Sequence, residues 1–280
     1  MTTQDLSSWI GRTETTQDRI THNLVQRLAA TLGEPAPAPG EALPALWHWA
    51  FFQPAVDAAG LGGDGHPARG GFLPPADNRN RMWAGSRLEF FGPLRVEAQV
   101  SRRSTILNVE EKHGRTGSLL FVTVKHEYVQ DARTVLVEEQ DIVYREPTPP
   151  KLGGTEPAPA GAWQETVEPT ATLLFRYSAV TFNGHRIHYD WPYVTETEGY
   201  PGLVVHGPLI ATLNLQAFRR ANPQAQVRRF SFRGLRPLIS PNAFEVGGRL
   251  LGSGKAQLWA TAEAGMAQAG EVEFTVEAGQ

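Results

Sequence analysis

The sequence predicts an α+β protein made of two similar halves joined by a linker. Three observations lead to this fold class. Strand-like alternation of apolar residues recurs in both halves, a proline-rich stretch separates them, and short landmark sequences return in the same order. With 280 residues, of which 41% are hydrophobic, the chain is long enough to bury a large core.

The first half begins with a predicted helix and continues with strands. Apolar residues recur every fourth position from Thr16 to Gly33, and Gly33-Glu34-Pro35 supplies a stop. From Arg87 onward the pattern is strand-like. It includes alternation from Leu94 to Val100, the stretches S-L-L-F-V-T-V and T-V-L-V-E-E-Q-D-I-V-Y, and G-R-T-G as a hairpin turn.

Prolines and glycines between Pro147 and Gly161 exclude a persistent helix or strand, which predicts a linker. We therefore expect an N-terminal domain at 1–146, a linker at 147–162 and a C-terminal domain at 163–280. In the second half, T-L-L-F-R-Y-S predicts a strand and Pro208 to Ala221 a helix. Further strands are expected at V-R-R-F-S-F, K-A-Q-L-W-A-T-A and E-V-E-F-T-V.

Two pairs of landmarks indicate an internal duplication. G-G-F-L at 70–73 aligns with H-G-P-L at 206–209, and F-G-P-L at 91–94 aligns with L-R-P-L at 235–238. In the first copy, Pro74-Pro75 and a polar run interrupt the segment that forms a good helix in the second. Chemistry is therefore expected in the second half.

Composition excludes several classes of function. The net charge of −3 and the lack of a basic run argue against a nucleic-acid partner, and the lack of cysteine excludes thiolate chemistry. No signal segment or membrane-length apolar run is present, so we expect a cytoplasmic protein with no membrane partner. The run G-L-G-G-D-G at 60–65 is interpreted as a plain flexible loop, because no strand precedes it and no helix follows.

Polar residues concentrate in T-F-N-G-H-R-I-H-Y-D at 181–190, which is followed by G-L-V-V-H-G-P-L at 202–209. Three interpretations are open: a metal site formed by His185, His188 and His206, ordinary buried histidines, or acid–base catalysis without metal. The spacing lacks the carboxylate–histidine pattern of zinc enzymes, so we expect no metal. A neutral imidazole can exchange a proton with water, while the Asn183 carboxamide can hold that water. Gly207 lies at a predicted helix start, where a backbone N–H can stabilise an enolate oxygen.

These residues resemble a known family. The second half is similar to MaoC-like (R)-specific enoyl-CoA hydratases, whose motif is D-x-N-P-L-H followed by H-G-x-L. Here N-G-H-R-I-H places Asn183 at the aspartate position, His185 at the asparagine position and His188 at the histidine position. The longer run T-F-N-x-H-R-I-H-Y-D resembles the type 2 hydroxyacyl-thioester dehydratase branch, which includes mesaconyl-C4-CoA and itaconyl-CoA hydratases. That likeness extends into L-W-H-W-A-F-F and M-W-A-G-S-R-L-E-F of the first half.

The resemblance implies a double hot-dog fold, with two curved antiparallel sheets each wrapped around a helix and a first half that has lost its chemistry. It implies reversible hydration of an α,β-unsaturated acyl-CoA, with a C5-dicarboxylyl-CoA as the expected substrate. His188 would act as the base, Asn183 would orient the water and Gly207 would hold the enolate. Arg186, His185 and His206 are expected to bind substrate, with Arg79, Arg81 and Arg87 as further candidates for a substrate carboxylate.

The same resemblance leaves other activities open. These are dehydration of 3-hydroxyacyl thioesters of other chain lengths, acyl-CoA thioester hydrolysis, and acyl-CoA binding without catalysis. No cofactor is expected, because CoA is part of the substrate. An acyl-CoA is the expected partner, and a homodimer is left open.

Overall fold

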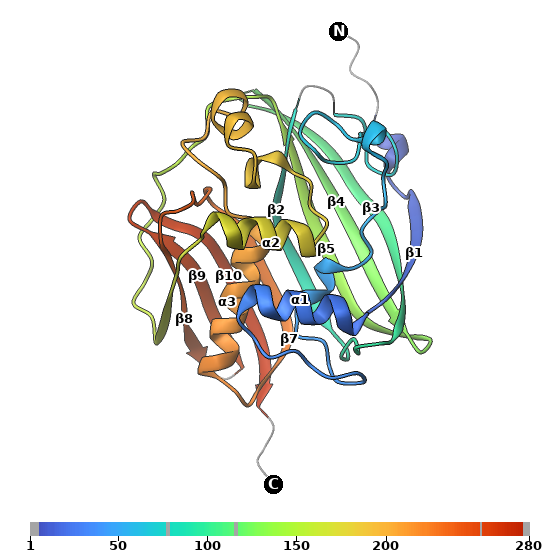
Figure 1. The fold of residues 1–280 in the computed structure, drawn as a ribbon, viewed down its shortest axis with the longest axis vertical. Coiled ribbons are helices and arrows are strands. Elements are labelled where there is room, and N and C mark those ends of the chain that lie inside the picture. Colours follow the sequence, from blue (N-terminus) through green and yellow to red (C-terminus); the bar gives the residue numbers. More distant parts are fainter. Residues whose placement is uncertain (1–5, 77–78, 115–116, 253, 277–280) are drawn as a thin grey trace.

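The computed structural model describes residues 6–76, 79–114, 117–252 and 254–276 (Figure 1). Its main feature is one antiparallel sheet of ten strands in the order β1-β3-β4-β5-β2-β7-β10-β9-β8-β6. The first-half strands are β1 (Thr13–Arg19), β2 (Asn80–Phe90), β3 (Gln99–Gly114), β4 (Gly117–Gln130) and β5 (Arg133–Arg145). The second-half strands are β6 (Trp163–Val167), β7 (Ala225–Gly234), β8 (Phe244–Gly252), β9 (Lys255–Ala262) and β10 (Gly265–Val276).

The strand order repeats the duplication seen in the sequence. Read from the outer edge inward, the first half runs β1-β3-β4-β5-β2 and the second runs β6-β8-β9-β10-β7, so corresponding strands occupy corresponding places. The two halves meet where β2 pairs with β7, for example at Ser86 opposite Phe232. They therefore form one continuous curved sheet rather than two separate sheets.

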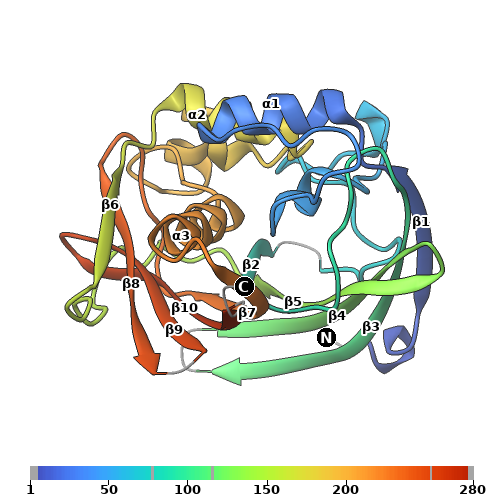
Figure 2. The same ribbon diagram turned by 90° about the horizontal axis from the view of Figure 1, so that it is seen from below.

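Three α-helices lie on the concave side of the sheet: α1 (His22–Leu32), α2 (Ala171–Val180) and α3 (Gly207–Ala221). Figure 2 shows α3 enclosed by the second-half strands, with α1 and α2 side by side above the opening. Pro208 at the start of α3 suits a helix N-terminus, since that position has no intrahelical N–H bond to lose. Burial of α3 on most of its surface fixes where its N-terminus lies.

The first half has no counterpart of α3 within its described residues. The short 3₁₀ turn η2 (Trp47–Ala50) lies there instead and is tied to the carboxylate of Glu138, which is fully buried. Glu138 accepts hydrogen bonds from Trp49 Nε1 and Ser86 Oγ, each at 3.0 Å, and lies 3.1 Å from His48 Nε2. Burial raises the pKa of Glu138, but the bonds and charges of His48, His126 and Gln140 together outweigh burial, and the pKa is lowered. Among the described residues, the enclosed central helix thus belongs to the second half, in agreement with the interruption predicted at Pro74-Pro75.

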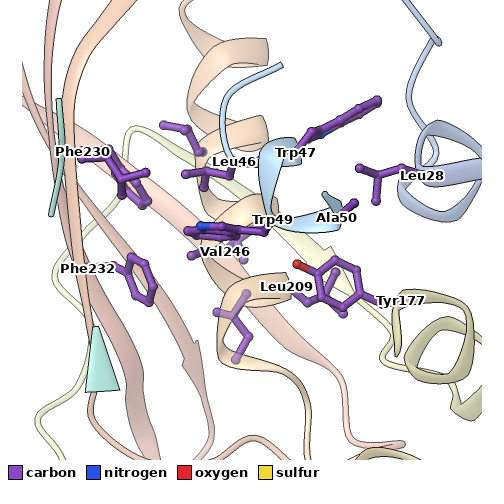
Figure 3. Close-up of a cluster of buried hydrophobic side chains, with 14 of the residues drawn as sticks. Leu28, Leu46, Trp47, Trp49, Ala50, Tyr177, Leu209, Phe230, Phe232 and Val246 are labelled. Atoms are coloured by element: carbon purple, nitrogen blue, oxygen red, sulfur yellow. The ribbon is translucent and has the colours of Figure 1, made fainter. Parts of the chain in front are cut away.

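A hydrophobic cluster joins the halves (Figure 3). Trp49 of the first half lies among Leu209, Phe232 and Val246 of the second, with its ring 5.9 Å from that of Phe232. All four side chains are buried. This packing places η2 against the start of α3, which is where the polar residues of the second half gather.

Three local predictions were wrong in whole or in part. Residues 16–19 of the first predicted helix form part of β1, and α1 begins only at His22. T-L-L-F-R-Y-S forms α2 rather than a strand, because Thr170 caps its first turn by accepting a hydrogen bond from Leu173 N at 3.1 Å. The alternating residues from Leu94 to Ala98 precede β3 instead of belonging to a strand. The tip of the predicted G-R-T-G hairpin, 115–116, lies outside the described residues.

Short helices complete the described chain: η1 (Ser7–Trp9), η3 (Ala58–Gly60), η4 (Arg186–His188) and the π-helical turn η5 (Tyr193–Thr197). None of the described helices has both the length and the apolar character needed to span a membrane. The predicted strands at V-R-R-F-S-F, K-A-Q-L-W-A-T-A and E-V-E-F-T-V, and the helix at Pro208 to Ala221, are confirmed.

Candidate active site

His188 is held in one orientation at the end of η4. Its Nδ1 lies 2.7 Å from the carbonyl oxygen of Val204, which can only accept, so the proton is on Nδ1 and Nε2 carries the lone pair. The Nε2 atom makes no hydrogen bond to the described residues. Burial lowers the pKa of His188 to about 4, despite the opposing effect of the Val204 carbonyl. The imidazole is therefore neutral near pH 7, and Nε2 is the atom that can accept a proton.

His206 and His185 flank this base. The ring of His206 stacks on His188 at 3.6 Å with an interplanar angle of 18°, and the ring of His185 meets it edge-on at 5.4 Å. His206 is fully buried, and its Nε2 forms a 2.8 Å hydrogen bond with Ser178 Oγ. Burial lowers the pKa of both flanking histidines well below the usual range. The predicted trio of histidines is thus brought together as neutral rings.

Asn183 shapes the turn that leads to His188. Its Oδ1 accepts a hydrogen bond from the backbone N–H of His185 at 3.0 Å, and its own N–H donates to Ser178 O at 2.8 Å. This is the side-chain turn that asparagine commonly forms two residues ahead. One lone pair of the carboxamide oxygen is therefore in use, and the second remains available to a water molecule.

Gly207 opens α3 beside these histidines. A Cβ at this position would meet nothing closer than the backbone oxygen of Trp83 at 4.0 Å, and the φ angle is outside the left-handed region. Neither packing nor conformation demands glycine here. The Gly207 N–H has no partner among the described residues, so it is free to donate to a ligand that needs close approach to the backbone.

Arg186 is largely committed to protein contacts. Its guanidinium forms an ion pair with Asp190 at 2.8 Å, donates to Gly63 O at 3.0 Å and lies 4.2 Å above the ring of Tyr193. The pairing of Arg186 with Asp190 four residues later is the arrangement expected if the segment coils. Arg186 lies at the site, but few of its donors are free for a substrate.

Sequence reasoning missed the contribution of the glycine-rich loop. Gly65 and Gly184 lie backbone to backbone, since a Cβ on Gly65 would fall 2.0 Å from Gly184 O. This contact brings His66 against His185, with ring centroids 4.3 Å apart, and Asp64 next to His66. The signal was present as D-G-H directly after the glycines, but nothing local to it indicated contact with residues about 120 positions later.

Comparison with known proteins places the chain in a family. The family model for hydroxyacyl-thioester dehydratase type 2 matches residues 46–240. The chain belongs to this family. Its mesaconyl-C(4)-CoA hydratase relative from Chloroflexus aurantiacus is 46% identical over 251 residues, covering 88% of this chain and 89% of that protein. The mitochondrial type 2 hydroxyacyl-thioester dehydratase of Schizosaccharomyces pombe is 32% identical over 221 residues, 68% of this chain and 72% of that one. Family membership classes the chain among hydro-lyases.

Solved structures confirm the fold. HtdX of Mycobacterium tuberculosis superimposes with a TM-score of 0.69 at 21% identity, covering 93% of this chain and 99% of that one. A second Mycobacterium tuberculosis protein, described as a double hot-dog fold, gives 0.64 at 12% identity and 97% coverage of both chains. The α+β double hot-dog expected from the sequence is thus confirmed.

Proposed function

We propose that the protein catalyses the reversible hydration of an α,β-unsaturated acyl-CoA, and that its acyl group is a C5 dicarboxylate. Mesaconyl-C4-CoA or itaconyl-CoA would be converted to citramalyl-CoA. The observation that carries the proposal is the neutral His188 with Nδ1 fixed on Val204 O and a free Nε2, close to the helix start at Gly207. The named activity of the Chloroflexus aurantiacus relative supports the choice of substrate.

In the proposed reaction of mesaconyl-C4-CoA, whose double bond is conjugated with the thioester, Nε2 of His188 takes a proton from water as the water oxygen bonds to the β-carbon. Electrons of the double bond move to the thioester oxygen, which accepts a hydrogen bond from Gly207 N–H. His188 then returns its proton to the α-carbon, so the substrate gains one water and His188 ends unchanged. A single base acting on both carbons favours syn addition.

The other polar groups would hold the reactants. Asn183 would orient the water through the free lone pair of its carboxamide, and His185 and His206 would line the substrate's path. The reaction uses no cofactor beyond the CoA of the substrate. We also propose that the protein is cytoplasmic.

A dicarboxylyl substrate needs a cation for its free carboxylate, and Arg81 is the candidate best suited to that role. Arg79 is paired with Glu111, and Arg87 is paired with Asp141 at an exposed face. The Arg81 guanidinium makes no ion pair or hydrogen bond with the described residues. It lies two residues from the inward-facing Trp83 on β2, and its charge contributes to lowering the pKa of His185.

Replacement of His188 by alanine tests the mechanism. The His188→Ala enzyme should remain folded by circular dichroism and lose hydration by roughly a hundredfold or more, since acid–base groups typically contribute that much. His113→Ala, which removes an exposed histidine, should hydrate at the parental rate. Near-normal hydration by His188→Ala would overturn the proposal.

The readout also separates the alternative activities. Loss of enoyl absorbance with the thioester intact indicates hydration, whereas release of free thiol indicates thioester hydrolysis. Binding of acyl-CoA with neither signal indicates a non-catalytic binding protein. A panel of enoyl thioesters, with products identified by mass spectrometry, then assigns the acyl group.

Arg81→Gln tests the carboxylate site separately. It should raise KM for mesaconyl-C4-CoA by about tenfold to a hundredfold, because losing a hydrogen bond to a charged group typically weakens binding by that factor. The KM for crotonyl-CoA, which lacks a free carboxylate, should change by less than about twofold. Arg87→Gln is the matched control. Equal losses on both substrates in the Arg81 variant would contradict a role in carboxylate recognition.

A further inference from the structure

The loop at 60–69 of the first half is part of the active-site wall. Besides the contact between Gly65 and Gly184, the N–H of Arg186 donates to Asp64 O at 2.9 Å, which ties the loop to η4. Within the loop, Gly62 N–H donates to His66 O at 2.7 Å. The side chains of Asp64 and His66 are therefore held at a fixed place next to the histidines.

Asp64 and His66 form a hydrogen-bonded pair. Asp64 Oδ1 accepts from the backbone N–H of His66 at 3.0 Å, and Oδ2 lies 3.3 Å from His66 Nδ1 and 3.2 Å from Arg69 Nη2. Burial alone would raise the pKa of Asp64, but the bonds and charge of His66 outweigh it, and the pKa is well below its usual range. Asp64 is thus a carboxylate anion, although its side chain is only 15% exposed.

A row of rings leads from this anion to the base. The distances between ring centroids are 4.3 Å from His66 to His185, 5.4 Å from His185 to His188 and 3.6 Å from His188 to His206. Because the carboxylate of Asp64 accepts a hydrogen bond at His66 Nδ1, the proton of this ring is on Nδ1 and its Nε2 carries the lone pair. The charged groups that act on this end of the row are Asp64, Arg69 and Arg81, and only Asp64 is negative.

A negative charge in this region would favour the proposed reaction. When His188 takes a proton, a positive charge appears in a buried site beside two other neutral imidazoles, and a nearby carboxylate would add to the compensation that the forming enolate supplies. Position 183 carries a carboxamide, which cannot supply that charge, and its oxygen is already bonded to His185 N.

We propose that Asp64 is the carboxylate partner of this active site, acting on His188 through His66 and His185 in place of a carboxylate at position 183. Asp64 is a positioning residue: it fixes the tautomer of His66 and stabilises the row while His188 is protonated. It exchanges no proton with the substrate, so the proton balance stays as given above. The inference rests on the proposed hydration by His188.

The decisive measurement is a double-mutant cycle of Asp64→Asn and Asn183→Asp. Asp64→Asn should lower kcat by about tenfold or more while KM stays within about twofold, because the carboxylate acts only when positive charge develops on His188 in the transition state. In the Asn183→Asp background, Asp64→Asn should lower kcat by less than about threefold, because position 183 then carries a carboxylate. A purely structural role of Asp64 gives no such rescue.

The control variant is Asp57→Asn, which removes an exposed carboxylate from the same connection and should keep parental kcat. Parental kcat in Asp64→Asn, or an equal loss in both backgrounds, would overturn the inference even if His188→Ala is inactive. If His188→Ala is active, the hydration mechanism itself fails, so the two failures are distinguishable.

One further arm addresses a metal site. Ligand atoms of Asp64, His66 and His185 lie within 4.8 Å of one another, a spacing that a metal ion accepts. However, Asp64 Oδ2 already faces the cation of Arg69. Turnover should therefore be unchanged after treatment with EDTA and dialysis. Loss of kcat that is restored by zinc would overturn the positioning role.

Discussion

The buried histidines make a specific prediction about acid stability. His188 has a pKa of about 4 in the folded protein, against 6.5 as the ordinary value. Because His188 binds a proton more readily in the unfolded chain, the free energy of unfolding decreases as pH falls from about 6.5 toward 4. Stability from this residue is fully present above 6.5. A difference of that size corresponds to about 3 kcal/mol for His188, at 1.36 kcal/mol per pKa unit.

The test compares urea unfolding of the parent and His188→Gln between pH 7 and 5. Glutamine keeps a donor for Val204 O but does not titrate, so the unfolding free energy of the variant should fall less steeply with pH than that of the parent. Between pH 6 and 5 the two slopes should differ by about 1 kcal/mol per pH unit. His113→Gln, with an exposed histidine replaced, should follow the parental curve. Equal slopes for His188→Gln and the parent would refute the claim that burial keeps His188 neutral.

Three further outcomes follow from local geometry. Gly65→Ala should destabilise the protein by about 1–3 kcal/mol or more in urea unfolding, because φ is +88° and the new Cβ would fall 2.0 Å from Gly184 O. Gly207→Ala should keep the parental melting temperature yet lower kcat, since Cβ has room in the fold but would crowd the thioester; a large drop in melting temperature would contradict this. Ser178→Ala should cost about 1–3 kcal/mol of stability by leaving His206 Nε2 buried without a partner.

Much of the fold could be predicted from local patterns. β-branched stretches identified β4 and β5, strand-like stretches identified β7, β9 and β10, and the proline start and apolar stripe identified α3. The errors came where tertiary context decides. T-L-L-F-R-Y-S is apolar enough for either element, and it became a helix through the Thr170 cap and packing over the sheet opening. Likewise, no local pattern shows that β2 pairs with β7, which joins two sheets into one.

The core of the candidate site was also visible in the sequence, because Asn183, His185 and His188 lie within six residues on one turn. What the sequence could not supply is the neighbour contributed by the first half. A glycine-rich run has the same composition whether it is mobile or packed. Only the approach of Gly65 to Gly184 distinguishes the two cases, and it depends on how both halves assemble.

That assembly gives the asparagine at position 183 a physical explanation. The turn at 183–185 needs a side chain that bonds the backbone of His185, and a carboxamide does this without adding charge. A carboxylate there would stand in the same buried site as Asp64, and two like charges would raise each other's pKa. With Asp64 ionised and held by Arg69 and His66, a neutral residue at 183 is the electrostatically consistent choice. The first half, which has no central helix among its described residues, would thus contribute to the proposed chemistry of the second half through the loop at 60–69.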